Sequence, residues 1–235
     1  SMNAIAVGEN AGKVNQNASS IALGTSAGTN SQGASSVAIG DSAGSMLQAG
    51  NAVAIGPGAG SDTQSDSSVS IGALAGSTFQ GQDAVAIGHS AGRSAQAANA
   101  VAVGYRAGVG SQHLSAVAVG LRAGENMQGI SSIAVGSDAG QTTQGDSAVA
   151  IGETAGQVTQ GIDSVAVGHS AGSNAQGSAA IAVGLQAGQT TQSAGAVAIG
   201  YLAGNTIQGV DGIAVGTAAG RNNQSLGCVA VGSNS

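Results

Sequence analysis

The sequence predicts an all-β fold, a parallel β-solenoid with two short strands in each coil, and three observations lead to this prediction. A sixteen-residue unit repeats about fourteen and a half times without insertion or deletion. Its consensus reads small-[IV]-A-[VIL]-G-x-x-A-G-x-x-x-Q-x-x-x. The composition, with 42 glycines, 1% aromatic residues and one proline, lacks the large side chains of an ordinary globular core. Such an uninterrupted period is typical of a solenoid of about 15 coils, each packed only on its neighbours.

The first expected strand of each coil comes just before a glycine, as in Val37–Ile39 before Gly40. Its two outer residues are Ile, Val or Leu in all fifteen copies, and the residue between them is alanine in fourteen and Ser70 in the other. Side chains alternate between the two faces of a strand, so both faces are constrained. A strand constrained on both faces is expected to be buried on both.

The alternation leaves two stripes to assign, and we expect the larger side chains to fill the inside of each coil. The predicted core residues include Val37, Ile39, Val117, Val119, Ile133 and Val135. The alanine stripe would then lie outside the coil, roughly 70 Å long at about 4.8 Å per coil. An apolar stripe of that length is larger than the exposed apolar patches of ordinary monomers, so we expect it to be buried between chains. The alternative interpretation is that alanine is tolerated there at a tight bend. The predicted trimer-interface residues include Ala38, Ala54, Ala86, Ala102, Ala118 and Ala134.

The second half of the coil, A-G-x-x-x-Q, predicts another short strand bounded by turns. The alanine before its glycine never varies and is expected inside the coil. The invariant glutamine is interpreted as a ladder, in which each amide bonds the amides above and below it or closes the backbone at a turn. A binding surface made of glutamines is the alternative interpretation. The ladder includes Gln112, Gln128, Gln144 and Gln160.

Several classes of function are disfavoured by the composition and the spacing. Catalysis needs different residue types brought together, whereas this chain offers the same residues in every coil, so we expect neither an enzyme nor a metal or cofactor site. The net charge of −6 disfavours a nucleic-acid partner. Apolar runs end after about four residues, so no membrane insertion by this segment is expected.

The expected domain organisation is simple. Ser1 and Met2 are interpreted as a cloning remnant, and residues 3–235 as a single repeat domain excised from a longer fibre. Cys228 is the one cysteine, so no disulfide within the chain is expected.

The run Ser36-Val37-Ala38-Ile39-Gly40, repeated with small variations in every coil, resembles the head repeat of the YadA-like trimeric autotransporter adhesins. The resemblance implies a left-handed parallel β-roll, three of which associate as a homotrimer in a fibre at the bacterial cell surface. It also implies that the alanine column faces the neighbouring chain. The sixteen-residue coil is longer than the usual coil of the family, and A-G-x-x-x-Q replaces its second segment. Similar arrays occur in fibres of phages and large viruses, so a purely structural fibre shaft is the alternative function.

The columns that vary from coil to coil are expected to form the outer surface. Tyr105 with Arg106 and Leu121 with Arg122 occupy consecutive coils and mix apolar side chains with arginine, a combination enriched at interfaces. These four residues are the predicted lateral contact with a host, prey or matrix molecule. An adhesive head would present such a cluster, whereas a passive spacer would present a featureless outer surface.

Overall fold

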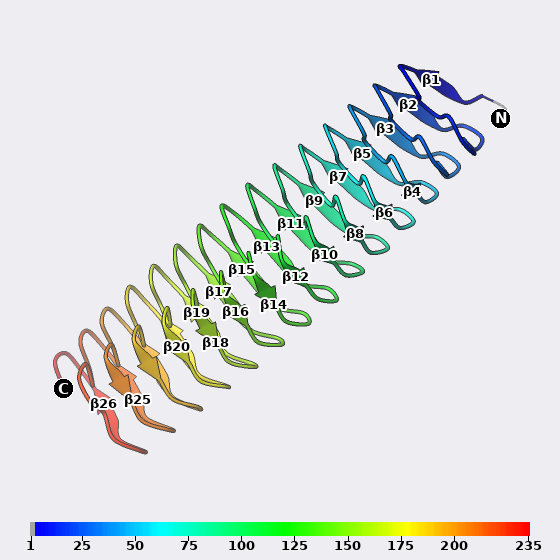
Figure 1. The fold of residues 1–235 in the computed structure, drawn as a ribbon. Helices are drawn as coiled ribbons and strands as arrows, with labels where there is room; N and C mark the ends of the chain where they lie inside the picture. The colour runs from blue at the N-terminus through cyan, green and yellow to red at the C-terminus, as the bar shows by residue number, and fades with distance from the viewer. Residues whose placement is uncertain (1–2) are drawn as a thin grey trace. The chain divides into compact units, whose positions relative to one another are not determined.

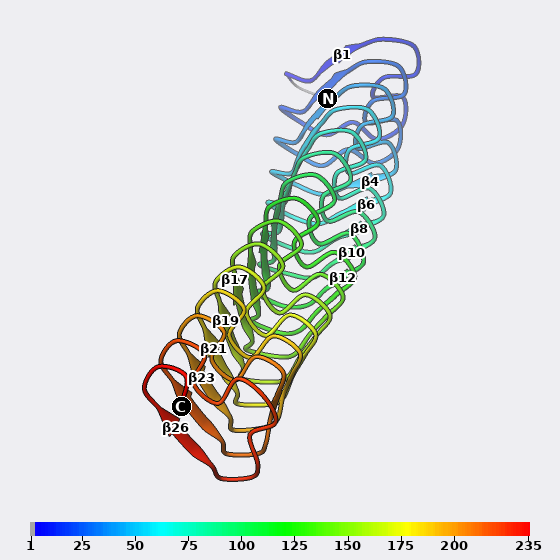
Figure 2. The same ribbon diagram turned by 90° about the vertical axis from the view of Figure 1, so that its left-hand side faces the viewer.

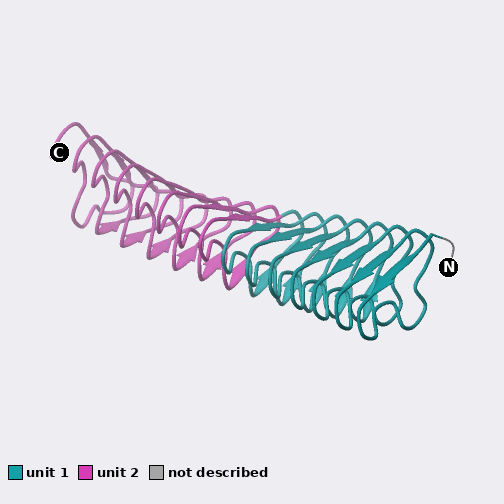
Figure 3. Cartoon of the chain, turned by 90° about the horizontal axis from the view of Figure 1, so that it is seen from above, with its two compact units in different colours: residues 1–115 teal, residues 116–235 magenta. Residues whose placement is uncertain are grey.

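The computed structural model describes residues 3–235, so the predicted cloning remnant lies outside the described residues. The described residues form parallel stacked coils of a β-solenoid with about 14 turns and contain no helix, which confirms the predicted fold class. The coils belong to two compact units that divide between Ser115 and Ala116 (Figure 3). Each unit is a stack of coils with the same two kinds of strand, and each is described by itself.

The first unit contains two parallel sheets, one on each side of its coils (Figures 1 and 2). The three-residue strands are β1 (Ile5–Val7), β2 (Ile21–Leu23), β3 (Val37–Ile39), β5 (Val53–Ile55), β7 (Val69–Ile71), β9 (Val85–Ile87) and β11 (Val101–Val103). The two-residue strands are β4 (Leu47–Gln48), β6 (Thr63–Gln64), β8 (Phe79–Gln80), β10 (Ala95–Gln96) and β12 (Ser111–Gln112).

The second unit repeats this arrangement. Its three-residue strands are β13 (Val117–Val119), β15 (Ile133–Val135), β17 (Val149–Ile151), β19 (Val165–Val167), β21 (Ile181–Val183), β23 (Val197–Ile199), β25 (Ile213–Val215) and β26 (Val229–Val231). Its two-residue strands are β14 (Met127–Gln128), β16 (Thr143–Gln144), β18 (Thr159–Gln160), β20 (Ala175–Gln176), β22 (Thr191–Gln192) and β24 (Ile207–Gln208).

Strand pairing follows the repeat without slippage. Ala134 of β15 pairs with Ala150 of β17, and Gln144 of β16 pairs with Gln160 of β18, always with the residue sixteen positions along the chain. Identical columns therefore stack directly above one another in each unit. The constant coil length in the sequence is the physical cause of this register, because an insertion would shift one side of a coil against the next.

Two glycines in each coil permit the close approach of backbone and side chains. Gly152, at the end of β17, has φ +125°, and a Cβ there would lie 2.7 Å from the carbonyl oxygen of Gly168 in the next coil. Gly140 has φ +52°, and a Cβ there would lie 2.9 Å from Oε1 of Gln144. Both backbone conformations favour glycine, so the two glycine columns of the sequence mark the places where the coil has no room for a side chain.

The core of each unit consists of small side chains and glutamine. The alanine between the two β-branched residues, the alanine before the second glycine, the small residue before the strand and the glutamine all point inward. In the coil that contains β15 these are Ala134 and Ala139, with Ser132 and Gln144, and each of them is at most 2% exposed. The predicted inward position of the invariant alanine before the second glycine is confirmed.

The prediction of which stripe lies inside the coil is wrong. The β-branched residues of the three-residue strands are at best half-buried and face outward, whereas the alanines between them, outside the terminal strands β1 and β26, are fully buried within a single chain. Predicted core residues that lie on the outward face are Val37, Ile39, Val117, Val119, Ile133 and Val135. Predicted interface residues that lie inside the coil, and therefore cannot meet a neighbouring chain, are Ala38, Ala54, Ala86, Ala102, Ala118 and Ala134.

The narrow cross-section of the coil explains this reversal. The alanine of the three-residue strand faces the second glycine of its coil so closely that a Cβ added at Gly140 would lie 3.3 Å from the Cβ of Ala134, nearer than an ordinary van der Waals contact. The remaining interior space is occupied by the glutamine side chain. A valine or isoleucine at the alanine position would therefore overlap groups that are already present, and overpacking of this kind is destabilising.

Candidate interaction surfaces

Each unit has a continuous apolar surface on its outward stripe, which we define as the two columns of Val, Ile and Leu in the three-residue strands. Each stripe residue stacks on a valine, isoleucine or leucine of the neighbouring coil, which covers its flanks but not its outer end. Ile151 remains 41% exposed and Ile199 remains 40% exposed. The exposed apolar surface that the sequence places on the alanine column therefore lies on this stripe.

The outward stripe is large by the standard of monomeric proteins. The second unit alone contributes sixteen side chains from its eight three-residue strands. At roughly 40 Å² for each, they would expose on the order of 600 Å², the upper end of the largest apolar patch on a typical monomer. A surface of this kind, flat and regular along the strands, is suited to packing against another protein surface.

The glutamine column forms the predicted ladder inside the coils. Nε2 of Gln144 donates to Oε1 of Gln160 at 3.1 Å, and to the carbonyl oxygens of Ile133 and Ala148 at 2.7 and 3.2 Å. Gln112 and Gln128 donate in the same way to the strand carbonyls eleven residues earlier in the chain. Because these glutamines are at most 2% exposed, their amides hold the two sides of a coil together and do not form a binding surface.

Some glutamines of the ladder have a side-chain oxygen that accepts no hydrogen bond. One coil shows that a hydroxyl in the alanine column can donate to the side-chain oxygen of a ladder glutamine. Oε1 of Gln144 is buried without a hydrogen-bond partner. In the coil with the one serine of the alanine column, the hydroxyl of Ser70 lies 2.6 Å from Oε1 of Gln80 and donates to it, beside Nε2 of Gln64, which donates to the same oxygen at 3.2 Å. The exceptional serine is therefore accommodated by the glutamine ten residues later in the chain.

We expect Ala134→Ser to stabilise the second unit, because the new hydroxyl would lie in the position of Ser70 and donate to the unpartnered Oε1 of Gln144. The expected gain is about 0.5–1.5 kcal/mol, the net value of one hydrogen bond. The measurement is the urea midpoint of unfolding. Ala150→Ser is the comparison variant: Oε1 of Gln160 already accepts from Gln144, as Oε1 of Gln80 accepts from Gln64 beside Ser70, so a second donor there should add less than the first donor at Gln144. Equal midpoints for the two variants would contradict the prediction.

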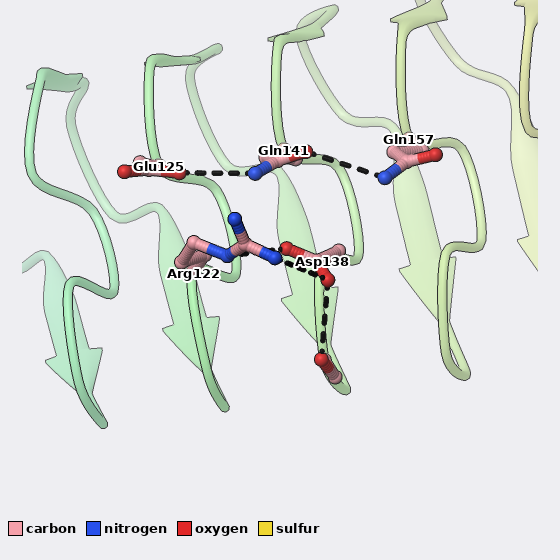
Figure 4. Close-up of polar contacts among 6 residues, drawn as sticks. Arg122, Glu125, Asp138, Gln141 and Gln157 are labelled. Atoms are coloured by element: carbon pink, nitrogen blue, oxygen red, sulfur yellow. Dashed lines mark hydrogen bonds and ion pairs between the residues drawn. The ribbon is translucent and has the colours of Figure 1, made fainter.

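A second ladder, which sequence reasoning missed, runs along the residue after the second glycine of the coil (Figure 4). Nε2 of Gln141 donates to Glu125 at 3.0 Å, and Nε2 of Gln157 donates to Oε1 of Gln141 at 3.3 Å. In the first unit, the hydroxyls of Ser45 and Ser61 donate to carbonyl oxygens one coil later. The signal in the sequence is that this column is polar in almost every coil, although its residue type changes.

The four residues of the predicted lateral contact are all exposed but are divided between the units. Tyr105 and Arg106 belong to the first unit, and Leu121 and Arg122 to the second. The guanidinium of Arg122 forms two contacts with the carboxylate of Asp138, Nε to Oδ1 at 2.8 Å and Nη2 to Oδ2 at 3.0 Å (Figure 4). The charge of Arg122 is thus already paired with a carboxylate of its own unit.

Sequence reasoning also missed His89 as a partner of Tyr105. The two rings stack with their centroids 5.4 Å apart and an angle of 17° between their planes. The available signal is that both residues directly follow the strand glycine, in consecutive coils. A repeat brings residues of one column into contact whenever they are one period apart.

The described residues contain no cluster of three or more histidine, cysteine or acidic side chains placed to hold a metal ion. Among residues 3–235 there is also no helix with the length and apolar character needed to cross a bilayer. A scan of the chain against models of known protein families finds no match, and a search of curated proteins finds no similar sequence.

Proposed function

We propose that the chain is a structural and adhesive segment of a homotrimeric fibre at the cell surface, where it attaches to a surface or extends the reach of an attachment. The observation that carries the proposal is the outward stripe, an apolar band that a single chain leaves half exposed in every coil. Its regularity favours a partner with the same period, and the partner with that period is another copy of the chain.

The stripe replaces the alanine column as the proposed contact between chains. Val149 and Ile151 of β17 lie on it, and the alanine between them does not. Packing three copies around one axis would bury the stripes of all three against each other in a common apolar core. The expected gain follows from the apolar area removed from water, at about 25 cal/mol per Å².

The choice of three chains rests on the resemblance of the V-A-I-G strand to the repeat of trimeric autotransporter adhesins. The same resemblance supports an extracellular location for the segment. The proposed partners are the other chains of the trimer and, through the outer columns, a molecule of a host, prey or matrix surface. We propose no catalytic role, because the repeat gives each unit the same few residue types in every coil.

A passive spacer, such as the shaft of a phage or virus fibre, is the second candidate. It is favoured by the outer columns, which differ from coil to coil and, along most of each unit, do not repeat any one side chain. A spacer would use the same trimeric packing and would lack a ligand. The two candidates therefore share an assembly and differ in what the outer columns bind.

The test of the assembly is the mass in solution. Sedimentation equilibrium should return three times 21.8 kDa, about 65 kDa, independent of protein concentration across the micromolar range. A stable species of 21.8 kDa would overturn the proposed trimer. Binding of the trimer to cells or to matrix proteins then separates an adhesive segment from a spacer.

A further inference from the structure

Two tight turns flank the three-residue strand of every coil, and each turn presents one side chain at a corner beside the outward stripe. In the coil of β21, a hydrogen bond of 3.3 Å from the amide of Ala180 to the carbonyl oxygen of Gly177 closes the first turn around Ser178. A bond of the same length closes the second turn around Leu185. We call these positions the leading corner, three residues before the stripe, and the trailing corner, two residues after it.

In the second unit, each coil carries at most one large apolar or aromatic side chain at its two corners. Six of the seven coils from β15 to β26 have one, and these six are exposed, from Val210 at 41% to Leu226 at 74%. The seventh, the coil of β17, has Asp146 and Glu153, and the coil of β13, which the units divide, has leucine at both corners. The large residues with the opposite corners of their coils are Ile130 with Ser137, Ile162 with His169, Leu185 with Ser178, Tyr201 with Ala194, Val210 with Thr217 and Leu226 with Ser233.

Packing within one chain does not explain this pattern. The two corners of a coil lie at opposite ends of the three-residue strand and are separated by it. Along a single corner column the residues follow no rule, since Tyr201 lies between Leu185 and Thr217, whereas Ile162 lies between Asp146 and Ser178. The regularity relates the two corners at one height, so it points to a contact that brings a leading and a trailing corner together from different molecules.

A second copy of the chain, related by rotation about an axis parallel to the stack of coils, supplies such a contact. The rotation keeps every coil at its own height. With the outward stripes turned toward the axis, the leading corner of one chain lies beside the trailing corner of the next. This contact is heterologous and closes into a ring. At each height a large side chain would then meet a smaller or polar one, as Leu185 would meet Ser178 of the next chain.

The same pairs distinguish chains in register from chains shifted by one coil. The corner pairs that a shift would create are Leu185 with Ile162 and Glu153 with Ile130 in one direction, and Tyr201 with Val210 and Glu153 with Ile162 in the other. Either shift crowds two large side chains and sets a carboxylate against an isoleucine, and both effects cost free energy. Chains in register place Glu153 beside Asp146, two exposed carboxylates whose repulsion water and salt screen.

We propose that the second unit binds a second copy of the chain in parallel and in register, with the leading corner of one chain packed against the trailing corner of the next. The observation that carries the proposal is the large side chain that occupies one corner or the other, coil by coil. The proposal rests on the trimer of the proposed function and specifies which surfaces of the chains meet, in which direction and at which height.

The experiment is cross-linking of the whole chain with a short bismaleimide, with Cys228→Ser in every variant to remove the native thiol. Ser178→Cys/Leu185→Cys places one cysteine at each corner of the coil of β21, and the denaturing gel should shift from 21.8 kDa to three times that mass. Ser178→Cys/Ser137→Cys is the matched control, because its two corners lie three coils apart, roughly 14 Å along the stack. The control should stay at 21.8 kDa.

Equal yields of covalent trimer from the two pairs, or covalent dimers from Ser178→Cys alone, would each overturn the contact in register. A link within one chain leaves the mass of a monomer and is thereby told apart. A circular dichroism spectrum identical to that of the parent shows that each variant is folded. Sedimentation gives the mass in solution of the same samples. A trimer that does not cross-link overturns the corner contact and leaves the trimer standing, whereas a monomer overturns the trimer and the contact with it.

Discussion

Ala134→Glu is expected to unfold the second unit, and Ile133→Glu, one residue earlier in the same strand, is expected to leave it folded but without its partner chains. Ala134 is completely buried, and a carboxylate there would have no cation to pair with, which costs several kcal/mol in addition to the overpacking. Ile133 lies on the outward stripe and is only half-buried. Its replacement by glutamate places the charge in water in a single chain and in an apolar interface in a trimer.

Circular dichroism and sedimentation measure the two outcomes separately. Ala134→Glu should lose the β spectrum of the unit, whereas Ile133→Glu should keep it and sediment at 21.8 kDa. If Ile133→Glu sediments with the mass of the parent trimer, the stripe does not form the contact between chains. If Ala134→Glu stays folded, the interior is less tightly packed than the distances indicate.

Gln96→Leu is expected to destabilise the first unit by about 3 kcal/mol, because it removes one donor that serves three acceptors. Nε2 of Gln96 donates to the carbonyl oxygens of Val85 and Ala100 at 2.8 and 3.2 Å, and to Oε1 of Gln112 at 3.1 Å. Its own Oε1 accepts from Gln80 at 3.2 Å. Leucine would fill a similar volume but would leave buried polar atoms without partners.

The measurement for Gln96→Leu is the urea midpoint of the far-ultraviolet signal. Gln82→Leu is the matched control, since Gln82 is an exposed glutamine of the same unit, two residues after a ladder glutamine. The two substitutions change the composition identically. Equal midpoints would mean that the ladder contributes nothing to the stability of the coil.

Much of the fold could be predicted from the sequence because the repeat carries it. The constant period fixes the parallel register, the glycine columns mark the tight turns, and the glutamine column implies an internal ladder. Gln96 and Gln144 make the predicted amide contacts with the next coil. Each of these inferences depends only on columns, which a repeat shows without any knowledge of three-dimensional packing.

The inside and the outside of the three-residue strand could not be assigned in the same way. Alternation shows that Val149 and Ile151 share one face and Ala150 the other, but it does not say which face is enclosed. Hydrophobicity favours the larger pair for the interior, and this preference is wrong here because glutamine already occupies that space. The better signal was volume: the stripe accepts Val, Ile or Leu, whereas the alanine column accepts nothing larger than Ser70.

The surroundings of the predicted lateral contact were visible only in part from the sequence. Tyr105 and Arg106 stood out by residue type, but the ring contact of His89 with Tyr105 depends on the stacking of one column across two coils. Leu121 and Arg122 follow the same sequence pattern, and the pairing of Arg122 with Asp138 one coil later was not visible from it. Pairing between neighbouring columns depends on side-chain conformation, which a repeat pattern does not specify.

A core of alanine, serine and glutamine also determines how the stability of the protein responds to temperature. The heat capacity rises on unfolding when apolar surface becomes hydrated and falls when amide surface does, and this interior exposes a large share of the second kind. The increment for a single chain should therefore lie below the usual value of about 12–15 cal/mol/K per residue, as differential scanning calorimetry would measure. A small increment flattens the curve of free energy against temperature, so the coil itself would lose little stability on cooling. Any strong curvature of the free energy of unfolding against temperature should then come from the valines and isoleucines of the outward stripe, which are buried only when chains associate.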